Sequence, residues 1–176
     1  MKRMFAALML AGTLAAPAAH AALAVGAKAP NFTTRGAIDG RVFTLTLAHQ
    51  LKHGPVVLYF FPKVFTKGCS AEARDFAENI DKFKAAGATV IGMSADPVDQ
   101  LAEFSTKECA GKFPVASAGP AIVSGFDVAL EMKPGITDRT SYVIAPSGRV
   151  AFVHSEMNYR GHVQSTLAYV QAMKAK

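Results

Sequence analysis

The feature of this sequence that most constrains its fold is a continuous apolar run at residues 56–61, Val-Val-Leu-Tyr-Phe-Phe, which leads into a segment with helical spacing. Such a run is typical of a central strand that is covered on both faces of its sheet. After a short loop, apolar residues recur along one face of a helix, at Ala73, Phe76, Ala77, Ile80 and Phe83. A covered strand followed by an amphipathic helix predicts an α/β protein.

Further strands and helices alternate with these along the chain. Residues 42–47 alternate between apolar and polar side chains as a half-buried strand does. Gly87 is expected to end the first helix, and residues 89–93 predict a second buried strand. We expect a second helix to begin with Asp96 as its N-cap and Pro97 in its first position.

The last third of the chain predicts an antiparallel pair of strands and a final helix. Residues 141–145 and 150–154 flank Pro-Ser-Gly-Arg, which is a tight-turn sequence, and a helix is expected from about Gly161. The complete pattern predicts a thioredoxin-like α/β sandwich, with a central mixed sheet, helices on both faces and a C-terminal β-hairpin.

Residues 1–21 have the pattern of a cleavable signal peptide. A Lys-Arg pair provides a charged start, residues 4–14 form an apolar stretch, and Ala-His-Ala at 19–21 is a small-residue cleavage site. The apolar stretch is too short for a membrane-spanning helix, which needs ~20 residues. We expect cleavage at this site, a single mature domain over residues 22–176, and export to the periplasm or out of the cell without a membrane anchor.

The composition excludes several classes of protein. With 51% hydrophobic and 18% charged residues, the chain is neither disordered, nor collagen-like, nor a polytopic membrane protein. The formal net charge is +6, of which Lys2 and Arg3 supply two, and the other basic residues are dispersed along the chain. A mild and dispersed positive charge does not predict nucleic-acid binding.

The reactive chemistry is concentrated where the covered strand meets its helix. The sequence Pro-Lys-Val-Phe-Thr-Lys-Gly-Cys at residues 62–69 places Cys69 in the first helical turn, where free backbone N–H groups and the helix dipole favour a thiolate. Thr66 precedes Cys69 by three residues, so its hydroxyl can point into the same space, and Pro62 can wall the loop without adding a donor. A helix terminus stabilises an anion by only about 0.3–1 kcal/mol. A nearby cation is therefore also required to keep the Cys69 thiol ionised.

The pattern Pro62-x-x-x-Thr66-x-x-Cys69 resembles the active-site signature of the peroxiredoxins, which are thiol-dependent peroxidases with a thioredoxin fold. The resemblance extends over nearly the whole chain after the signal peptide. It includes Val-Gly-Ala-Lys-Ala-Pro-Asn-Phe at residues 25–32 and Asp-Arg-Thr-Ser-Tyr-Val-Ile at residues 138–144. The sequence is most similar to the bacterioferritin-comigratory, or Q-type, branch of that family.

The resemblance implies a role for each residue of the signature. Cys69 is then the peroxidatic nucleophile, Thr66 hydrogen-bonds the peroxide oxygens, and Pro62 shields the thiolate from water. Arg139 holds the thiolate and polarises the O–O bond, and Glu72 helps to order the site by engaging an Arg. The resemblance further implies hydrogen peroxide or organic hydroperoxides as substrates, an external dithiol protein of thioredoxin type as reductant, and a monomer or weak dimer. It implies no metal, haem or flavin cofactor.

The second cysteine leaves two possibilities open. Many Q-type enzymes have a resolving Cys five residues after the first, but this chain has Arg74 at that position. Cys109 is expected late in the second helix, as in members of the branch whose resolving thiol lies there, and would condense with a Cys69 sulfenic acid to an intramolecular disulfide. Alternatively, Cys109 fills the core and an external thiol resolves the enzyme.

Other interpretations compete for the same residues. Two cysteines in an exported protein can form a permanent disulfide, which would make the chain a non-catalytic binding module. A thioredoxin-like protein-disulfide oxidoreductase would need Cys-x-x-Cys, but Thr66 occupies the position three before Cys69. Glu72 could be an exposed residue at a helix start, and Arg139 a solvated charge at a strand entrance.

Overall fold

The computed structural model of the protein describes residues 22–175, and the predicted signal peptide at residues 1–21 lies outside the described residues. The helices and strands follow one another along the chain in this order: β1 (Thr33–Ile38), β2 (Arg41–Thr46), α1 (Leu47–Gln50), the 3-10 turn η1 (Leu51–His53), β3 (Val56–Phe60), α2 (Lys67–Ala85), β4 (Thr89–Ser94), α3 (Val98–Lys107), β5 (Val115–Ser117), α4 (Pro120–Gly125), β6 (Thr140–Ile144), β7 (Val150–Ser155) and α5 (His162–Lys174).

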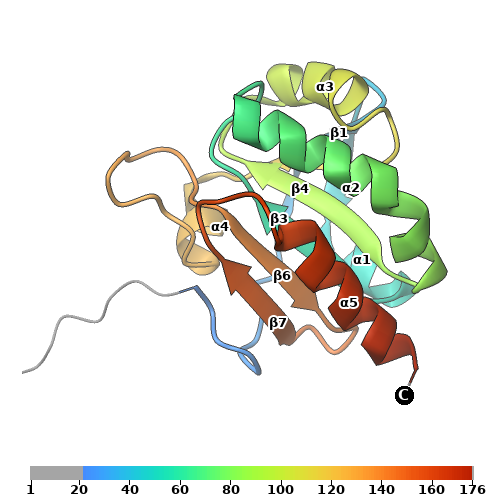
Figure 1. Ribbon diagram of the computed structural model, residues 1–176. Helices are drawn as coiled ribbons and strands as arrows, with labels where there is room; N and C mark the ends of the chain where they lie inside the picture. Colours follow the sequence, from blue (N-terminus) through green and yellow to red (C-terminus); the bar gives the residue numbers. More distant parts are fainter. Residues whose placement is uncertain (1–21, 176) are drawn as a thin grey trace, which may run out of the picture.

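The strands form one seven-stranded mixed sheet in the order β2-β1-β5-β4-β3-β6-β7. The β3–β4 and β4–β5 pairs are parallel, and the remaining pairs are antiparallel. Strands β6 and β7 form the predicted hairpin. Figure 1 shows α2 and α5 crossing one face of this sheet, while α1 and α4 lie behind it.

Two hydrophobic cores, one on each face, explain why β3 is apolar at every position. Val57 and Tyr59 point into the core shared with α2, α3 and α5. Their neighbours Val56, Leu58 and Phe60 point into the opposite core, which contains residues of α1 and α4. All five β3 side chains are fully buried, so the predicted covered strand and the predicted helices on both faces are confirmed.

Helix α2 begins and ends where the sequence predicts. Its buried face includes the five apolar residues at helical spacing. At its C-terminus, Gly87 adopts φ +78°, a left-handed conformation that favours glycine. The Ala88 N–H then donates to the carbonyl oxygen of Phe83 at 2.9 Å, and the Gly87 N–H donates to that of Lys84 at 2.8 Å, which is a Schellman ending.

The structure corrects the expectation for the second helix. Pro97, not Asp96, is the N-cap residue of α3, and the Asp96 carboxylate instead accepts hydrogen bonds from the Val64 N–H at 2.9 Å and from the Ser94 hydroxyl. Asp96 therefore anchors the loop before α2. The helix also ends at Lys107, so Cys109 lies just after α3 and not late within this helix, as was expected.

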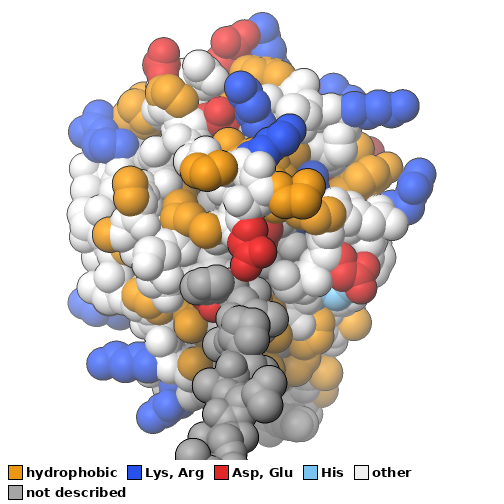
Figure 2. Space-filling model, turned by 90° about the vertical axis from the view of Figure 1, so that its left-hand side faces the viewer, with side chains coloured by type: hydrophobic (Ala, Val, Ile, Leu, Met, Phe, Trp, Pro, Cys, Tyr) orange, Lys and Arg blue, Asp and Glu red, His pale blue; other side chains and the backbone are white. Residues whose placement is uncertain are grey.

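No helix among the described residues is long and apolar enough to cross a membrane. On the face shown in Figure 2, Lys and Arg side chains are spread over the upper part, both sides and the lower left, with hydrophobic side chains among them. The positive charge is therefore dispersed on this face, as the sequence predicts.

Candidate active site

The turn from β3 into α2 positions Cys69. Thr66 is the N-cap residue of α2 and Cys69 is the third helical residue, so Cys69 lies in the first turn as predicted. The first intrahelical bond runs from the Ser70 N–H to the carbonyl oxygen of Thr66 at 2.9 Å. The N–H groups before it, including that of Cys69, have no partner within the helix and direct partial positive charge toward this end. The thiol is free and only 1% exposed.

Arg139 reaches Cys69 from the loop that leads into β6. Its Nη2 lies 3.3 Å from the Cys69 Sγ, and its Nη1 pairs with the Oε2 atom of Glu72. Its Nε donates to the carbonyl oxygen of Met157 at 3.0 Å. The side chain is 5% exposed, so it is not the solvated charge of the alternative interpretation. Three contacts in different directions fix the plane of the guanidinium against the sulfur.

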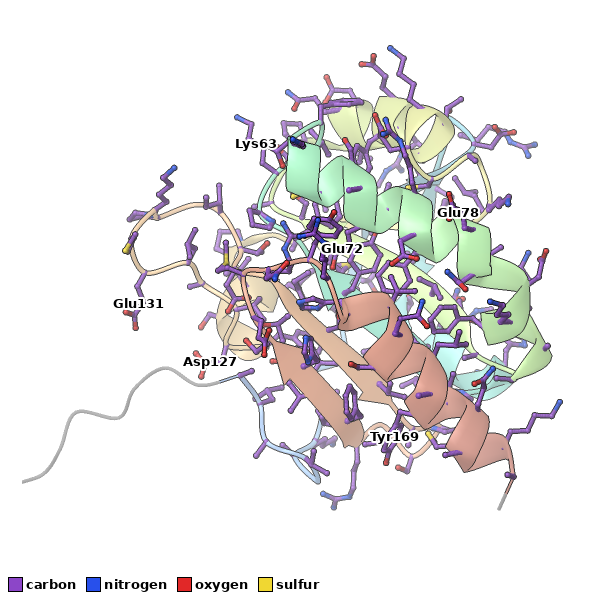
Figure 3. The ribbon with its side chains drawn as sticks, viewed as in Figure 1. Lys63, Glu72, Glu78, Asp127, Glu131 and Tyr169 are labelled. Carbon is purple, nitrogen blue, oxygen red and sulfur yellow. The ribbon has the colours of Figure 1, made fainter. Side chains whose placement is uncertain are left out.

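Glu72 lies one helical turn after Cys69 and is fully buried, so it is not an exposed residue at a helix start. Figure 3 shows its side chain directed from α2 toward the N-terminal end of α5. Burial raises the pKa of Glu72 to about 8, and Arg139 opposes that shift. Burial acts to lower the pKa of Arg139, but Glu72 and Cys69 outweigh it, so this pKa is raised and the guanidinium stays charged.

Thr66 and Pro62 belong to the loop in front of the thiol. The Thr66 hydroxyl donates to the carbonyl oxygen of Lys63 at 3.0 Å, and Pro62 is half-buried. Phe65 has φ +58°, which is uncommon for a residue other than glycine, and its ring packs edge-on against Phe104. The loop is therefore held in a specific conformation by its own hydrogen bond and by the Phe65 contact.

Cys109 lies in different surroundings. It is a free thiol, is fully buried, and belongs to the same hydrophobic core as Cys69. Burial raises its pKa, and the neighbouring Glu108 carboxylate adds to that shift. Glu108 in turn forms a 2.6 Å ion pair with Arg74 of α2. Arg74, which occupies the position of the resolving Cys in many Q-type enzymes, therefore binds the segment that contains Cys109.

The structure also brings in a residue to which the sequence assigns no role. His162, the first residue of α5, is fully buried, and its Nδ1 lies 3.8 Å from the Oε1 of Glu72. It is 90 residues away from Glu72 in the chain and belongs to no motif, so only the packing of α5 beside α2 reveals the contact. Among residues 22–175, no group of three or more His, Cys, Asp or Glu side chains could hold a metal ion.

The chain is similar to known proteins over most of its length. The family model described as "AhpC/TSA family" matches residues 25–153. The chain is 32% identical over 149 residues to the chloroplastic peroxiredoxin Q of Oryza sativa subsp. japonica, covering 84% of this chain and 67% of the rice protein. It is 33% identical over 124 residues to the peroxiredoxin Bcp of Xanthomonas campestris, covering 66% of this chain and 76% of that protein.

The fold is similar to those of solved structures. The crystal structure of peroxidoxin BcpB from Mycobacterium tuberculosis is similar with a TM-score of 0.74 and 29% sequence identity, over 85% of this chain and 97% of that chain. The structure of Mycobacterium tuberculosis AhpC, at 22% identity and a TM-score of 0.75, shares the fold.

Proposed function

The chain belongs to the AhpC/TSA family and is a thiol-dependent peroxidase of the peroxiredoxin type, and on that premise we propose that Cys69 is the sulfur that attacks the peroxide. The observation that carries this proposal is the 3.3 Å contact between the Cys69 Sγ and a buried Arg139 whose other nitrogens are already bonded. A cation held in this way can stabilise a thiolate without reorganising when charge develops.

The attack is a displacement at oxygen. The Cys69 thiolate forms an S–O bond as the O–O bond of the hydroperoxide breaks, the departing alkoxide or hydroxide takes up a proton, and the products are a Cys69 sulfenic acid and an alcohol or water. Arg139 lies where it can also donate to a peroxide oxygen in front of the sulfur. We expect both hydrogen peroxide and organic hydroperoxides to be reduced.

Thr66 and Pro62 are proposed to shape the peroxide side of the site. Thr66 occupies the N-cap position of the helix that carries Cys69, and its hydroxyl has one donor hydrogen, which is bonded to the carbonyl oxygen of Lys63. A hydroxyl that donates in this way keeps its lone pairs free to accept a hydrogen bond from the O–H of an incoming hydroperoxide. Pro62 lacks an N–H and limits water beside the sulfur.

We propose that Cys109 resolves the sulfenic acid. The Cys109 thiol attacks the sulfur of the Cys69 sulfenic acid, a disulfide forms and water leaves. An external dithiol of thioredoxin type then reduces this disulfide, regenerates both thiols and becomes a disulfide itself. Because Cys109 is fully buried, the segment after α3 must open before the two sulfurs can approach to the ~2 Å of a disulfide bond.

The proposed nucleophile is tested by a single round of oxidation in the Cys109→Ser variant. One equivalent of hydrogen peroxide should produce a sulfenic acid that dimedone traps on the Cys69 peptide, as read by mass spectrometry. In wild type the same treatment should give a Cys69–Cys109 disulfide within one chain. A dimedone adduct absent from Cys69, or a wild-type protein with both thiols intact after reaction, contradicts the proposal.

We further propose that the chain is exported and matured by removal of residues 1–21. The charged start, the short apolar stretch and the small-residue cleavage site support this proposal. The N-terminal sequence of the exported protein should begin at Ala22. A soluble protein that keeps Met1 contradicts it.

A further inference from the structure

His162 lies beside the Oε1 atom of Glu72, the carboxyl oxygen that does not pair with Arg139. It contacts the Ser141 Oγ through Nδ1 at 2.8 Å and the carbonyl oxygen of Glu156 through Nε2 at 2.9 Å. A carbonyl oxygen only accepts, so Nε2 carries the hydrogen and Nδ1 is left as the acceptor for the Ser141 hydroxyl. Burial lowers the pKa of His162 to about 4, and His154 and Arg139 contribute, which agrees with a neutral ring.

This tautomer leaves the second oxygen of Glu72 without a donor. The Oε2 atom pairs with Arg139, but Oε1 is buried, has no hydrogen-bond partner among residues 22–175, and lies 3.8 Å from the Nδ1 of His162. Nδ1 carries no hydrogen, and its one lone pair accepts from the Ser141 hydroxyl, so the ring offers Oε1 no donor. A buried carboxylate oxygen without a donor is costly, so the surroundings of Oε1 favour a protonated Glu72. The raised pKa of Glu72 is consistent with this geometry.

The state of Glu72 matters to Cys69 because both groups share one guanidinium. Arg139 reaches the sulfur through Nη2 and the carboxyl group through Nη1. If Glu72 is ionised, it neutralises much of the positive charge that would otherwise stabilise the thiolate. If Glu72 is protonated, the thiolate is the main anion facing Arg139.

We propose that His162 is a positioning residue for the peroxidase reaction, because its neutral ring keeps the Glu72 carboxyl group protonated and so directs the Arg139 cation to the Cys69 sulfur. The inference rests on the proposed function of Cys69. The polar and titratable groups that face this pair from every neighbouring element are Tyr59 of β3, Cys69 and Asp75 of α2, Arg139 and Ser141 of β6 and the loop before it, His154 of β7, and Glu156 and Asn158 after β7.

The test compares His162→Asn with wild type in the full chain. The Asn amide can donate to Oε1, so Glu72 would ionise and compete for Arg139. We expect the pH midpoint for iodoacetamide labelling of Cys69 to rise by about 0.5–1 unit, and peroxide oxidation below that midpoint to slow by about 3–10-fold. His49→Asn, an exposed histidine remote from the site, is the matched control and should leave both unchanged.

A double-mutant cycle separates this role from a purely structural one. In a Glu72→Gln background the carboxyl group cannot ionise, so adding His162→Asn should change the midpoint by less than about 0.3 unit. An equal rise in both backgrounds, or an unmoved midpoint in the single variant, overturns the proposal.

Ser141→Ala covers the case in which His162→Asn does not fold. This variant keeps His162 and frees the Nδ1 lone pair. The pH midpoint for labelling of Cys69 should therefore stay the same or fall, and a rise in that midpoint contradicts the proposal. Cys69→Ser is assayed in parallel: if it keeps its peroxidase activity, the proposed function itself fails, independently of His162.

Discussion

The two cysteines of this protein are buried to the same extent in the same core and still have opposite surroundings. Cys69 lies at the N-terminal end of α2 with a fixed cation 3.3 Å away. Cys109 lies just beyond the C-terminal end of α3, next to the Glu108 carboxylate, and burial raises its pKa. Burial alone disfavours the thiolate form of a cysteine, whereas a helix N-terminus and a guanidinium beside a buried sulfur stabilise that form.

Removing the Cys69 sulfur should have the largest effect. We expect Cys69→Ser to lose peroxidase activity by at least about 10³-fold, because a neutral hydroxyl is a far weaker nucleophile toward peroxide. The measurement is peroxide consumption with a thioredoxin-type dithiol. If the variant matches wild type, the contrast between the two thiols has no catalytic meaning.

Removing the cation should have the next largest effect. We expect Arg139→Ala to slow the oxidation of Cys69 by about 10²–10³-fold. The oxidation rate of Arg139→Lys should lie between those of wild type and Arg139→Ala. An ammonium keeps the charge but cannot contact Cys69, Glu72 and the Met157 carbonyl together. Stopped-flow oxidation with hydrogen peroxide measures both. Equal rates in all three proteins would show that the contact with the sulfur is incidental.

Cys109→Ser should separate the first step from the rest of the cycle. The first oxidation of Cys69 should stay within about twofold of wild type, because Cys109 plays no part in it. Steady-state turnover with a thioredoxin-type reductant should fall by about tenfold or more, because no intramolecular disulfide forms. Wild-type turnover in this variant would assign resolution to an external thiol and leave Cys109 as a core residue.

Releasing the segment that holds Cys109 should give the smallest effect. Arg74 pairs with Glu108 across a partly exposed surface, a type of pair that is worth about 0–1 kcal/mol. Arg74→Ala should therefore speed disulfide formation after oxidation by up to about fivefold and leave the oxidation step unchanged. The exposed Arg41, on β2, provides the control substitution Arg41→Ala. A slower resolution step in Arg74→Ala would show that the pair promotes opening.

Much of the fold could be predicted because its central elements carry strong local patterns. The apolar run of β3, the helical spacing of α2 and the turn between β6 and β7 each identify their element. The elements that were missed lack such patterns: β5 has three residues, α4 has six, and β1 has few apolar positions. They are stabilised by neighbours in the sheet and core, which local sequence does not encode.

In the candidate site, too, the residues of a local pattern could be predicted, whereas those that depend on packing could not. The signature with Thr66 and Cys69 is local, and Arg139 could be matched to it only through a family resemblance. Asp96 was misassigned because an acidic residue before a Pro resembles a helix cap, whereas the fold uses its carboxylate to hold the loop at Val64. The contact of His162 with Glu72 could not be predicted from the sequence, because it depends on α5 packing beside α2.

The most direct test of the contrast between the two thiols is a pulse of iodoacetamide on the fully reduced wild-type protein at about pH 5.5, where only an activated thiol alkylates quickly. Digestion and mass spectrometry then report labelling at each cysteine. We expect Cys69 to be labelled at least about tenfold faster than Cys109, and the difference to disappear in denaturant. Equal labelling of both thiols in the folded protein, or faster labelling of Cys109, would contradict the proposed activation of Cys69.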